Sequence, residues 1–207
     1  MNYEHIEWQN SNSATGISFQ CGYCGNKAGP SIRFPAKGKR DVIYICPTCS
    51  QPTYFDSKQE QTPKPRLGDE ISGINKPNVA LLYNEARDCT SVGAYTAAVM
   101  ACRKILMNLA VDQKAEEGKQ FAYYVDYLKD NGFVPPQGKE WVKAIKDRGN
   151  DANHQIVPMD EEDATLILHF PGALLRFNYE LPSVLEADTK KRTPLSGTEG
   201  STENPSK

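Results

Sequence analysis

Long apolar runs are absent from this sequence, and none approaches the roughly 18 residues that a membrane helix needs. Residues 1–10 also lack the basic and apolar stretches of a signal peptide. We therefore expect a cytoplasmic protein with no membrane partner, in which thiol groups stay reduced. A large excess of one charge is missing too, because the formal net charge is −2. The composition as a whole thus does not indicate a nucleic-acid-binding protein.

The charges are nevertheless unevenly distributed along the 207 residues. Residues 1–66 hold 8 Lys and Arg against 5 Asp and Glu, a net charge of +3. Residues 67–187 hold 12 against 18, a net charge of −6. A basic patch that contacts nucleic acid is therefore to be sought in the first of these segments.

Composition divides the chain into four segments. Residues 1–56 alternate short β-prone stretches with Gly and Pro, which predicts strands and turns. Residues 57–76 are polar, contain proline and show no periodicity, so we expect a linker there. Residues 77–187 carry helical periodicity. Residues 188–207 contain one leucine as their only large apolar side chain, which predicts a disordered tail.

Five amphipathic helices are predicted in the third segment. Apolar side chains recur there at intervals of three and four residues, and Gly93 and the Pro135-Pro136 pair interrupt the pattern. The fifth helix begins at Asp160, whose carboxylate can cap it, and we expect a kink at Pro171. Five such helices can bury one shared core. The chain is therefore predicted to be an α+β multidomain protein, with a small β unit before an all-α five-helix bundle.

Four of the six cysteines form two Cys-x-x-Cys pairs, which are separated by 21 residues. Each pair can fold as a turn with both sulfur atoms toward one ion, and the intervening residues are long enough for a hairpin that brings the pairs together. Four thiolates in a tetrahedron suit Zn²⁺, and such a closed site has no position for a substrate. The sequence therefore predicts a structural zinc ion, whose binding supplies folding energy. The predicted ligands are Cys21, Cys24, Cys46 and Cys49.

An iron–sulfur cluster and a redox-active dithiol are the alternatives for the same four cysteines. Over roughly residues 15–56 the sequence resembles the zinc-ribbon family in its two cysteine turns, including the Gly25 and Pro47 that follow ligands. That resemblance implies a metal site and leaves the partner open. The other cysteines, Cys89 and Cys102, fall on apolar helical faces and are interpreted as core residues.

A basic stretch lies between the two cysteine pairs, with no acidic residue between Gly25 and Arg40. Tyr23, Phe34 and Tyr44 lie near it, and cations interleaved with aromatic rings suit phosphate contact and base stacking. A solvated hairpin loop is the alternative, and zinc ribbons also serve as protein-docking modules. The predicted nucleic-acid-binding residues are Lys27, Arg33, Lys37, Lys39 and Arg40.

Residues 147–154, DRGNDANH, place a charge on a predicted apolar helix face. Arg148 follows Ile145 by three residues and Trp141 by seven, so it shares their inward-facing side, where an unpaired charge is costly. His154 lies six residues further, about 120° around an ideal helix from Arg148. The two side chains can converge only if the helix ends or distorts between them, which the Gly, Asn and Asp residues favour, or if two chains contribute.

Several motifs together resemble the bacterial domain-of-unknown-function family 4145, which is similar to the α-helical HEPN superfamily. The resemblance covers residues 77–187 and implies that the five-helix bundle is HEPN-like. The RGNDANH block is its most specific part. The matching motifs are Ala86-Arg87, residues 93–98 (GAYTAA), Arg103, Trp141, Ile145, residues 148–154 (RGNDANH) and residues 161–164 (EEDA).

HEPN domains that cleave RNA carry an Arg-x4–6-His motif, which Arg148-x5-His154 fits. The resemblance implies a homodimer through the helical domain, in which both motifs line one cleft. The 2′-hydroxyl of the RNA then attacks its own phosphate without a metal. His154 would be the general acid and base, and Arg148 would stabilise charge on the phosphoryl group. Asn150 or Asp151 would orient them.

Two functions are compatible with these residues. One is a metal-independent RNA endonuclease whose zinc ribbon holds the RNA. The other is a non-catalytic adaptor that recruits a nucleic-acid or protein partner, for which the resemblance implies a phage-defence or restriction context. Gly149 and Met107 stand where HEPN relatives often carry a polar residue and a glutamate, which favours the adaptor. Arg148 would then pair with a nearby acid. The candidate acids are Asp147, Asp151 and Glu85.

Overall fold

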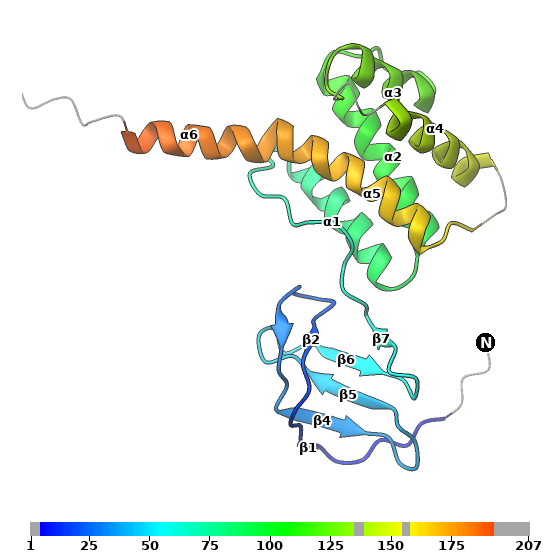
Figure 1. Cartoon of the computed structure of the whole chain (residues 1–207), viewed down its shortest axis with the longest axis vertical. Helices are drawn as coiled ribbons and strands as arrows, with labels where there is room; N and C mark the ends of the chain where they lie inside the picture. The colour runs from blue at the N-terminus through cyan, green and yellow to red at the C-terminus, as the bar shows by residue number, and fades with distance from the viewer. Residues whose placement is uncertain (1–4, 135–138, 155–157, 193–207) are drawn as a thin grey trace, which may run out of the picture.

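The structure of the protein, a computed structural model, describes residues 5–134, 139–154 and 158–192, with only the backbone described at residues 139, 149–154 and 192. A β region precedes a helical region, as Figure 1 shows. The predicted α+β class, with a small β unit before five consecutive helical rods, is therefore confirmed. In the described part of the chain, no helix is long and apolar enough to span a membrane.

Five strands form one antiparallel sheet in the order β1-β4-β5-β6-β7, and two further strands form a separate hairpin. In β4 and β5, Arg33 pairs with Tyr44, and in β5 and β6, Val42 pairs with Phe55. The strands are β1 (Asn12–Ser13), β2 (Phe19–Gln20), β3 (Lys27–Ala28), β4 (Ile32–Pro35), β5 (Val42–Ile45), β6 (Pro52–Phe55) and β7 (Gln61–Thr62).

One face of the sheet carries a small apolar core. Side chains alternate along β5 and β6, so that Tyr44 and Phe55 are buried on the same face. Phe19 of β2 packs edge-on against Phe55, with 5.1 Å between the ring centroids. Cys21 and Cys46 belong to this same buried cluster. The apolar centre of the β region is therefore contiguous with its cysteines.

The helical region packs around α2, which lies against α1, α3, α4 and α5. Its apolar stripe, including Val99, Ile105 and Leu106, is fully buried. The last three elements follow one another without a break and form a single long rod (Figure 1). The helices are α1 (Pro77–Ser91), α2 (Tyr95–Asp112), α3 (Phe121–Asp130), α4 (Lys139–His154), α5 (Glu161–Leu175), the π-helical turn η2 (Arg176–Glu180) and α6 (Leu181–Arg192).

The last rod begins as its sequence predicts, and it departs from α geometry beyond Pro171, where we expect a kink. Asp160 caps α5 and accepts a hydrogen bond from the backbone N–H of Asp163 at 2.9 Å. The helix continues through Pro171, although an interior proline removes one ladder hydrogen bond and its ring crowds the carbonyl four residues before it. The departure from α geometry is the π-helical turn η2, which begins five residues after Pro171.

Residues 57–76, predicted to be a linker, contain strand β7 and then lie along α1. Arg87 of α1 holds this segment, because its Nε donates to the carbonyl of Leu67 at 3.2 Å and its Nη2 to that of Gly68 at 3.3 Å. Leu67, Ile71 and Ile74 pack against the helical core. These three residues are four and three positions apart, but Gly68 and Gly73 lie among them and the segment is otherwise polar, so the sequence pattern did not reveal this contact.

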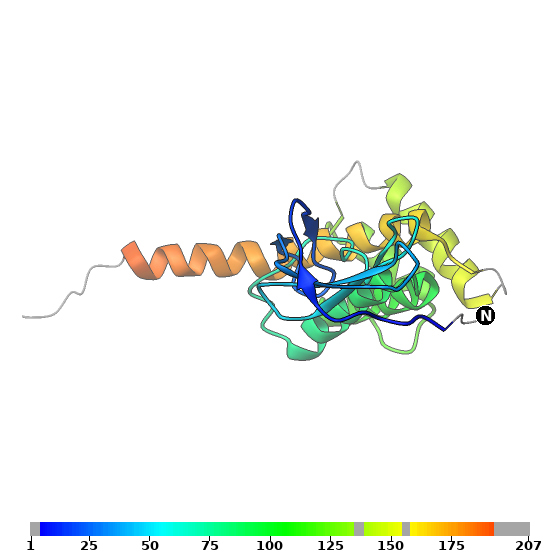
Figure 2. The ribbon, with the colours of Figure 1, turned by 90° about the horizontal axis from the view of Figure 1, so that it is seen from below.

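Helix α6 enters the segment predicted to be a disordered tail. It extends to Arg192, whereas the tail was expected from residue 188. Residues 193–207 lie outside the described residues. Figures 1 and 2, taken at right angles, both show α6 projecting beyond the rest of the helical region.

Candidate metal centre and polar sites

The four predicted metal ligands converge in one cluster, in the turns that follow β2 and β5. Their Sγ atoms all lie within 4.8 Å of one another. The Cys21 and Cys49 sulfurs are 3.7 Å apart, and those of Cys24 and Cys46 are 3.8 Å apart. A tetrahedron of sulfurs about 2.3 Å from a zinc ion has edges of about 3.8 Å. The predicted grouping is therefore confirmed, and its geometry fits a four-thiolate metal site.

Two matching turns aim these sulfur atoms. Gly25 donates its backbone N–H to the carbonyl of Cys21 at 2.9 Å, and Ser50 donates to that of Cys46 at 2.9 Å. Both donors have positive φ values, 71° for Gly25 and 59° for Ser50. Glycine adopts this conformation readily, whereas serine does so at a cost. The fold thus accepts backbone strain at Ser50 to bring the second pair of thiols into position.

The crowded thiols differ in acidity. Burial opposes ionisation of Cys46, but the backbone N–H groups of Cys49 and Thr48 outweigh it and lower the pKa of Cys46 to about 7. Burial and then neighbouring thiols raise the pKa of Cys49 to about 12. One thiolate therefore forms readily and discourages the next. Four thiolates can coexist at neutral pH only around a cation, which is the condition that a bound metal ion meets.

The structure separates the five residues predicted to contact nucleic acid. Arg33 lies on β4, and the turn that joins β4 to β5 follows it, whereas Lys27 lies on the separate β2–β3 hairpin. Because β5 leads from this turn to Cys46, the turn and the cysteine cluster lie at opposite ends of the sheet. The three cations in the turn are Lys37, Lys39 and Arg40.

Polar and aromatic partners surround the β4–β5 turn. Lys37 forms an exposed ion pair with Glu7, with 3.0 Å between Nζ and Oε1. Trp8, which the sequence reasoning did not select, is bridged to Ala36 beside the turn, and its side chain is exposed. Tyr44, one of the predicted stacking residues, is buried in the core. Trp8 is therefore a partly exposed ring on the segment beside the turn, and it packs edge-on against Tyr54, with 6.1 Å between the ring centroids.

Arg148 is held by an acid at the start of α5. Its Nε donates to Oδ1 of Asp163 at 2.6 Å, and the two side chains are 40% and 26% exposed. The carboxylate of Asp163 also closes the capping box with Asp160. Asp163 was not among the acids considered from the sequence as partners. Asp163 lies three residues after Asp160, as the second residue of a capping box does. A role at the start of α5 therefore accounted for its presence in the sequence, and nothing indicated that it also binds Arg148.

The helix end predicted between Arg148 and His154 is wrong, because α4 continues to His154. Gly, Asn and Asp each cost a helix only up to about 1 kcal/mol, so packing of the preceding turns can carry the helix through them. On a continuous helix, positions 148 and 154 lie about 120° apart around the helix axis. The side chains of the predicted catalytic residues Asn150, Asp151 and His154 lie outside the described residues.

A second polar cluster, which the sequence did not indicate, joins the segment after β7 to two helices. Lys64 Nζ lies 2.9 Å from Oε2 of Glu161, and the hydroxyl of Tyr95 donates to the same oxygen at 2.8 Å. The hydrogen bond from Lys64, followed by that from Tyr95, lowers the pKa of the Glu161 carboxyl. Lys64 and Glu161 are 97 residues apart, so no local pattern could have paired them.

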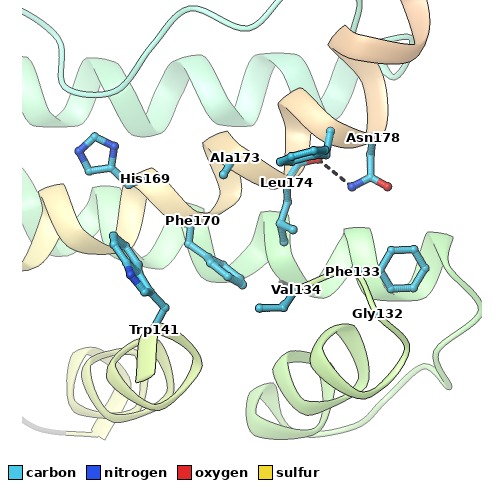
Figure 3. Close-up of a pocket in the computed structure, with 10 residues that line it drawn as sticks. Gly132, Phe133, Val134, Trp141, His169, Phe170, Ala173, Leu174 and Asn178 are labelled. Carbon is cyan, nitrogen blue, oxygen red and sulfur yellow. Dashed lines mark hydrogen bonds between the residues drawn. The ribbon is translucent and has the colours of Figure 1, made fainter. Parts of the chain in front are cut away.

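An apolar groove of about 770 Å³ lies between the last rod and the side of the domain formed by α4 and the end of α3. In Figure 3, Trp141 rises from α4 toward α5, and Phe170 and Leu174 point from α5 into the same space. Phe177 of η2 also lines the groove, while Asn178 donates to the backbone carbonyl of Leu174 at 2.7 Å. The groove therefore suits an apolar occupant.

Comparison with known proteins bears on the helical region. The family described as "Domain of unknown function (DUF4145)" matches residues 84–192, from the middle of α1 to the end of α6. No curated protein and no solved structure matches the chain. The matched residues include Arg103, Arg148 and the RGNDANH block that suggested this family. Because they make up more than half of the sequence, the chain belongs to the DUF4145 family.

Proposed function

We propose that this protein is a module that binds single-stranded nucleic acid, in which a zinc ribbon makes the contact and a HEPN-like helical domain supports it. The observation that carries the proposal is the β4–β5 turn, which holds Lys37, Lys39 and Arg40 and is bridged at Ala36 to the partly exposed Trp8. Cations neutralise phosphates, and an exposed indole offers a surface on which a base can stack.

Zinc is the metal we propose for the cysteine cluster. The four sulfurs fit its tetrahedral geometry, and a closed four-thiolate site stabilises the fold without offering a position for a substrate. The cluster lies at the far end of the sheet from the basic turn. Its role in binding is therefore to hold the short strands in place, so that β4 and β5 present their turn.

We propose that a single chain binds nucleic acid and does not cleave it. Positions 148 and 154 lie about 120° apart on the continuous helix α4, and Arg148 is paired with Asp163. A binding module of this kind would act as an adaptor. The phage-defence or restriction context that the family resemblance implies is part of this proposal.

The test is the affinity of the full chain for a fluorescently labelled single-stranded RNA or DNA, measured by anisotropy at several salt concentrations. Arg40→Glu should weaken binding by at least about tenfold and reduce the salt dependence by about one phosphate contact. Trp8→Ala should weaken it by about tenfold through lost stacking. Lys104→Glu makes the same charge change on the exposed surface of α2 and should have little effect. Absence of binding at low salt, or equal loss in Lys104→Glu, would overturn the proposal.

A second function is favoured by the partly exposed guanidinium of Arg148, which Asp163 fixes on the helix that carries His154. We propose that RNA cleavage, if this domain performs it, takes place between two chains. The RNA 2′-hydroxyl would attack the phosphorus as His154 accepts its proton. The bond from phosphorus to the 5′-oxygen would break as protonated His154 of the partner subunit donates a proton to that oxygen. The product is a 2′,3′-cyclic phosphate.

This second function has its own test. Purified protein is incubated with RNA in EDTA, and the ends of the fragments are analysed. The expected result is cleavage with cyclic-phosphate ends that is lost in His154→Ala and retained in His169→Ala, a change of the same type on α5. Intact RNA, or equal cleavage by His154→Ala, would exclude the mechanism.

A further inference from the structure

A cleft of about 870 Å³ lies between the β region and helix α1, and we call it the α1 cleft. Its volume falls within the range of pockets that bind small ligands. One wall belongs to the β region and includes Tyr23, Ile43 and Tyr54. The other wall belongs to α1 and includes Glu85 and Asp88. In Figure 1, β6 and β7 form the edge of the sheet that lies nearest the helical region.

The face of the sheet opposite its small core leads into the α1 cleft. Phe34, Ile43 and Tyr54 are paired in register across β4, β5 and β6, so their side chains lie on one face. All three are half-buried, whereas Tyr44 and Phe55 are buried on the core face. The outer face therefore carries a strip of apolar and aromatic side chains, two of which line the cleft.

This strip lies next to the basic β4–β5 turn. Trp8, which is bridged to Ala36 beside the turn, packs edge-on against Tyr54. Ile43 is three residues after Arg40, which is about 10 Å along an extended strand. A nucleic-acid strand whose phosphates contact the turn can therefore place a nearby base in the cleft.

The charges in the α1 cleft suit a base better than a phosphate. Asp88 forms an ion pair with Arg66, with 2.6 Å between Oδ1 and Nε. Glu85 is exposed, and no described residue forms a hydrogen bond or an ion pair with its carboxylate. That negative charge repels phosphates, which stay at the turn. Tyr23 is 41% exposed and offers a ring on which a base can stack.

We infer that the α1 cleft binds one unstacked guanine base of the single strand, an inference that rests on the proposed function. The two oxygens of the Glu85 carboxylate accept hydrogen bonds from the adjacent N1–H and N2–H groups of guanine. A carboxylate accepts two parallel hydrogen bonds from an arginine in the same way. The Watson–Crick edges of adenine, cytosine and uracil lack two adjacent donors, so each of these bases leaves one carboxylate oxygen unpaired. Glu85 is thus a specificity-determining residue.

The test is an anisotropy titration of the full chain with two labelled single-stranded RNAs. Both are uridine oligonucleotides, and one central position holds either guanine or inosine, whose base lacks only the N2 amino group. Wild type should bind the guanine RNA about tenfold more tightly. Glu85→Gln should bring the two affinities within about threefold, because one acceptor is lost. Glu117→Gln makes the same change between α2 and α3, outside the cleft, and should keep the tenfold ratio.

Stacking on Tyr23 has a different signature. Tyr23→Ala should weaken binding of the guanine and inosine RNAs equally, by about tenfold, because stacking does not depend on the N2 amino group. Tyr23→Phe should retain the wild-type affinities, since it keeps the ring. The zinc content of both variants is measured as well, because Tyr23 lies between two of the cysteines. A change in the guanine-to-inosine ratio in Tyr23→Ala would contradict these separate roles.

The outcomes separate this inference from the function on which it rests. If wild type binds both RNAs equally, or if Glu85→Gln keeps the tenfold ratio, the inference is overturned and the binding module stands. If neither RNA binds at low salt, the proposed function fails. A carboxylate between aromatic rings also suits a basic peptide. Tight binding of a labelled lysine-rich peptide that Glu85→Gln abolishes, with no preference for guanine, would make the cleft a peptide site instead.

Discussion

Gly22, inside the first Cys-x-x-Cys turn, lies so close to Lys64 that a methyl group on Gly22 would be 2.5 Å from the Lys64 carbonyl oxygen. Lys64 is fixed in turn, because its backbone N–H donates to the carbonyl of Ser91 at 2.8 Å and its side chain binds Glu161. The turn that holds two of the metal ligands is thus linked to α1 and α5 through one residue.

Replacing Gly22 with alanine should destabilise the protein by about 1–3 kcal/mol, because two backbone segments must move apart to admit the methyl group. Gly29→Ala is the matched control, since a Cβ there meets no atom within 4 Å. Urea unfolding of the metal-loaded proteins measures the difference. Equal stability of the two variants would show that the Gly22 contact is loose.

Metal analysis of the purified chain should give one zinc ion per molecule. Cys49→Ser should lower this content and Cys89→Ser should not, because Cys89 lies on α1 away from the cluster. A strong chelator should remove the metal and unfold the β region, while the helical circular dichroism signal largely persists. Iron in place of zinc, or loss of metal in Cys89→Ser, would refute the assignment.

The ion pair between Arg148 and Asp163 should contribute little to stability, because both side chains are partly open to solvent. Arg148→Met should therefore lower the free energy of unfolding by about 1 kcal/mol or less. Asp163→Ala should cost more, since it also removes half of the capping box with Asp160. Chemical denaturation compares the two. A loss of several kcal/mol in Arg148→Met would point to a buried role for this arginine.

The π-helical turn should be sensitive to acid. The backbone N–H of Ser72, followed by Arg176 and the Ser72 hydroxyl, lowers the pKa of Glu180 from an ordinary 4.5 to about 2. A carboxyl group with a lowered pKa stabilises the fold above its ordinary pKa, and this contribution is lost as the pH falls from about 4.5 toward 2. The protection factors of the α6 amides, which correct exchange rates for their intrinsic pH dependence, should therefore fall over that interval.

Glu180→Gln is the variant that isolates this effect. Its α6 protection factors should be lower than those of wild type at neutral pH and should change less between pH 5 and pH 2.5, because the titrating group is gone. Ser72→Ala should fall between the two, since it removes the hydroxyl and leaves the backbone donor. The same acid response in Glu180→Gln and wild type would assign it to other groups.

The parts of this protein that its sequence predicted are those with a local signature. Two Cys-x-x-Cys pairs need only a hairpin to meet, so the grouping of Cys21, Cys24, Cys46 and Cys49 followed from spacing. The helices followed from apolar residues at intervals of three and four, and Asp160 marked a helix start because capping acts within one turn.

The parts that it did not predict depend on contacts between distant segments. Lys64 meets Glu161 only after the segment beyond β7 has packed on α1, and Arg148 meets Asp163 only after α4 has docked beside α5. The composition of residues 149–154 suggested a helix end, yet α4 continues through them. Local propensities of about 1 kcal/mol do not decide a helix that tertiary packing already holds.

The π-helical turn sets the direction in which the exposed side of α6 faces. Each residue of an α-helix turns the chain by about 100°, so one residue more or less in Arg176–Glu180 would rotate everything beyond it by that angle. A single deletion there would leave the composition of α6 intact and swing Leu181, Val184 and Leu185 away from the line of the groove. The number of residues in the π-helical turn thus determines which way the exposed side chains of α6 face, whatever those side chains are.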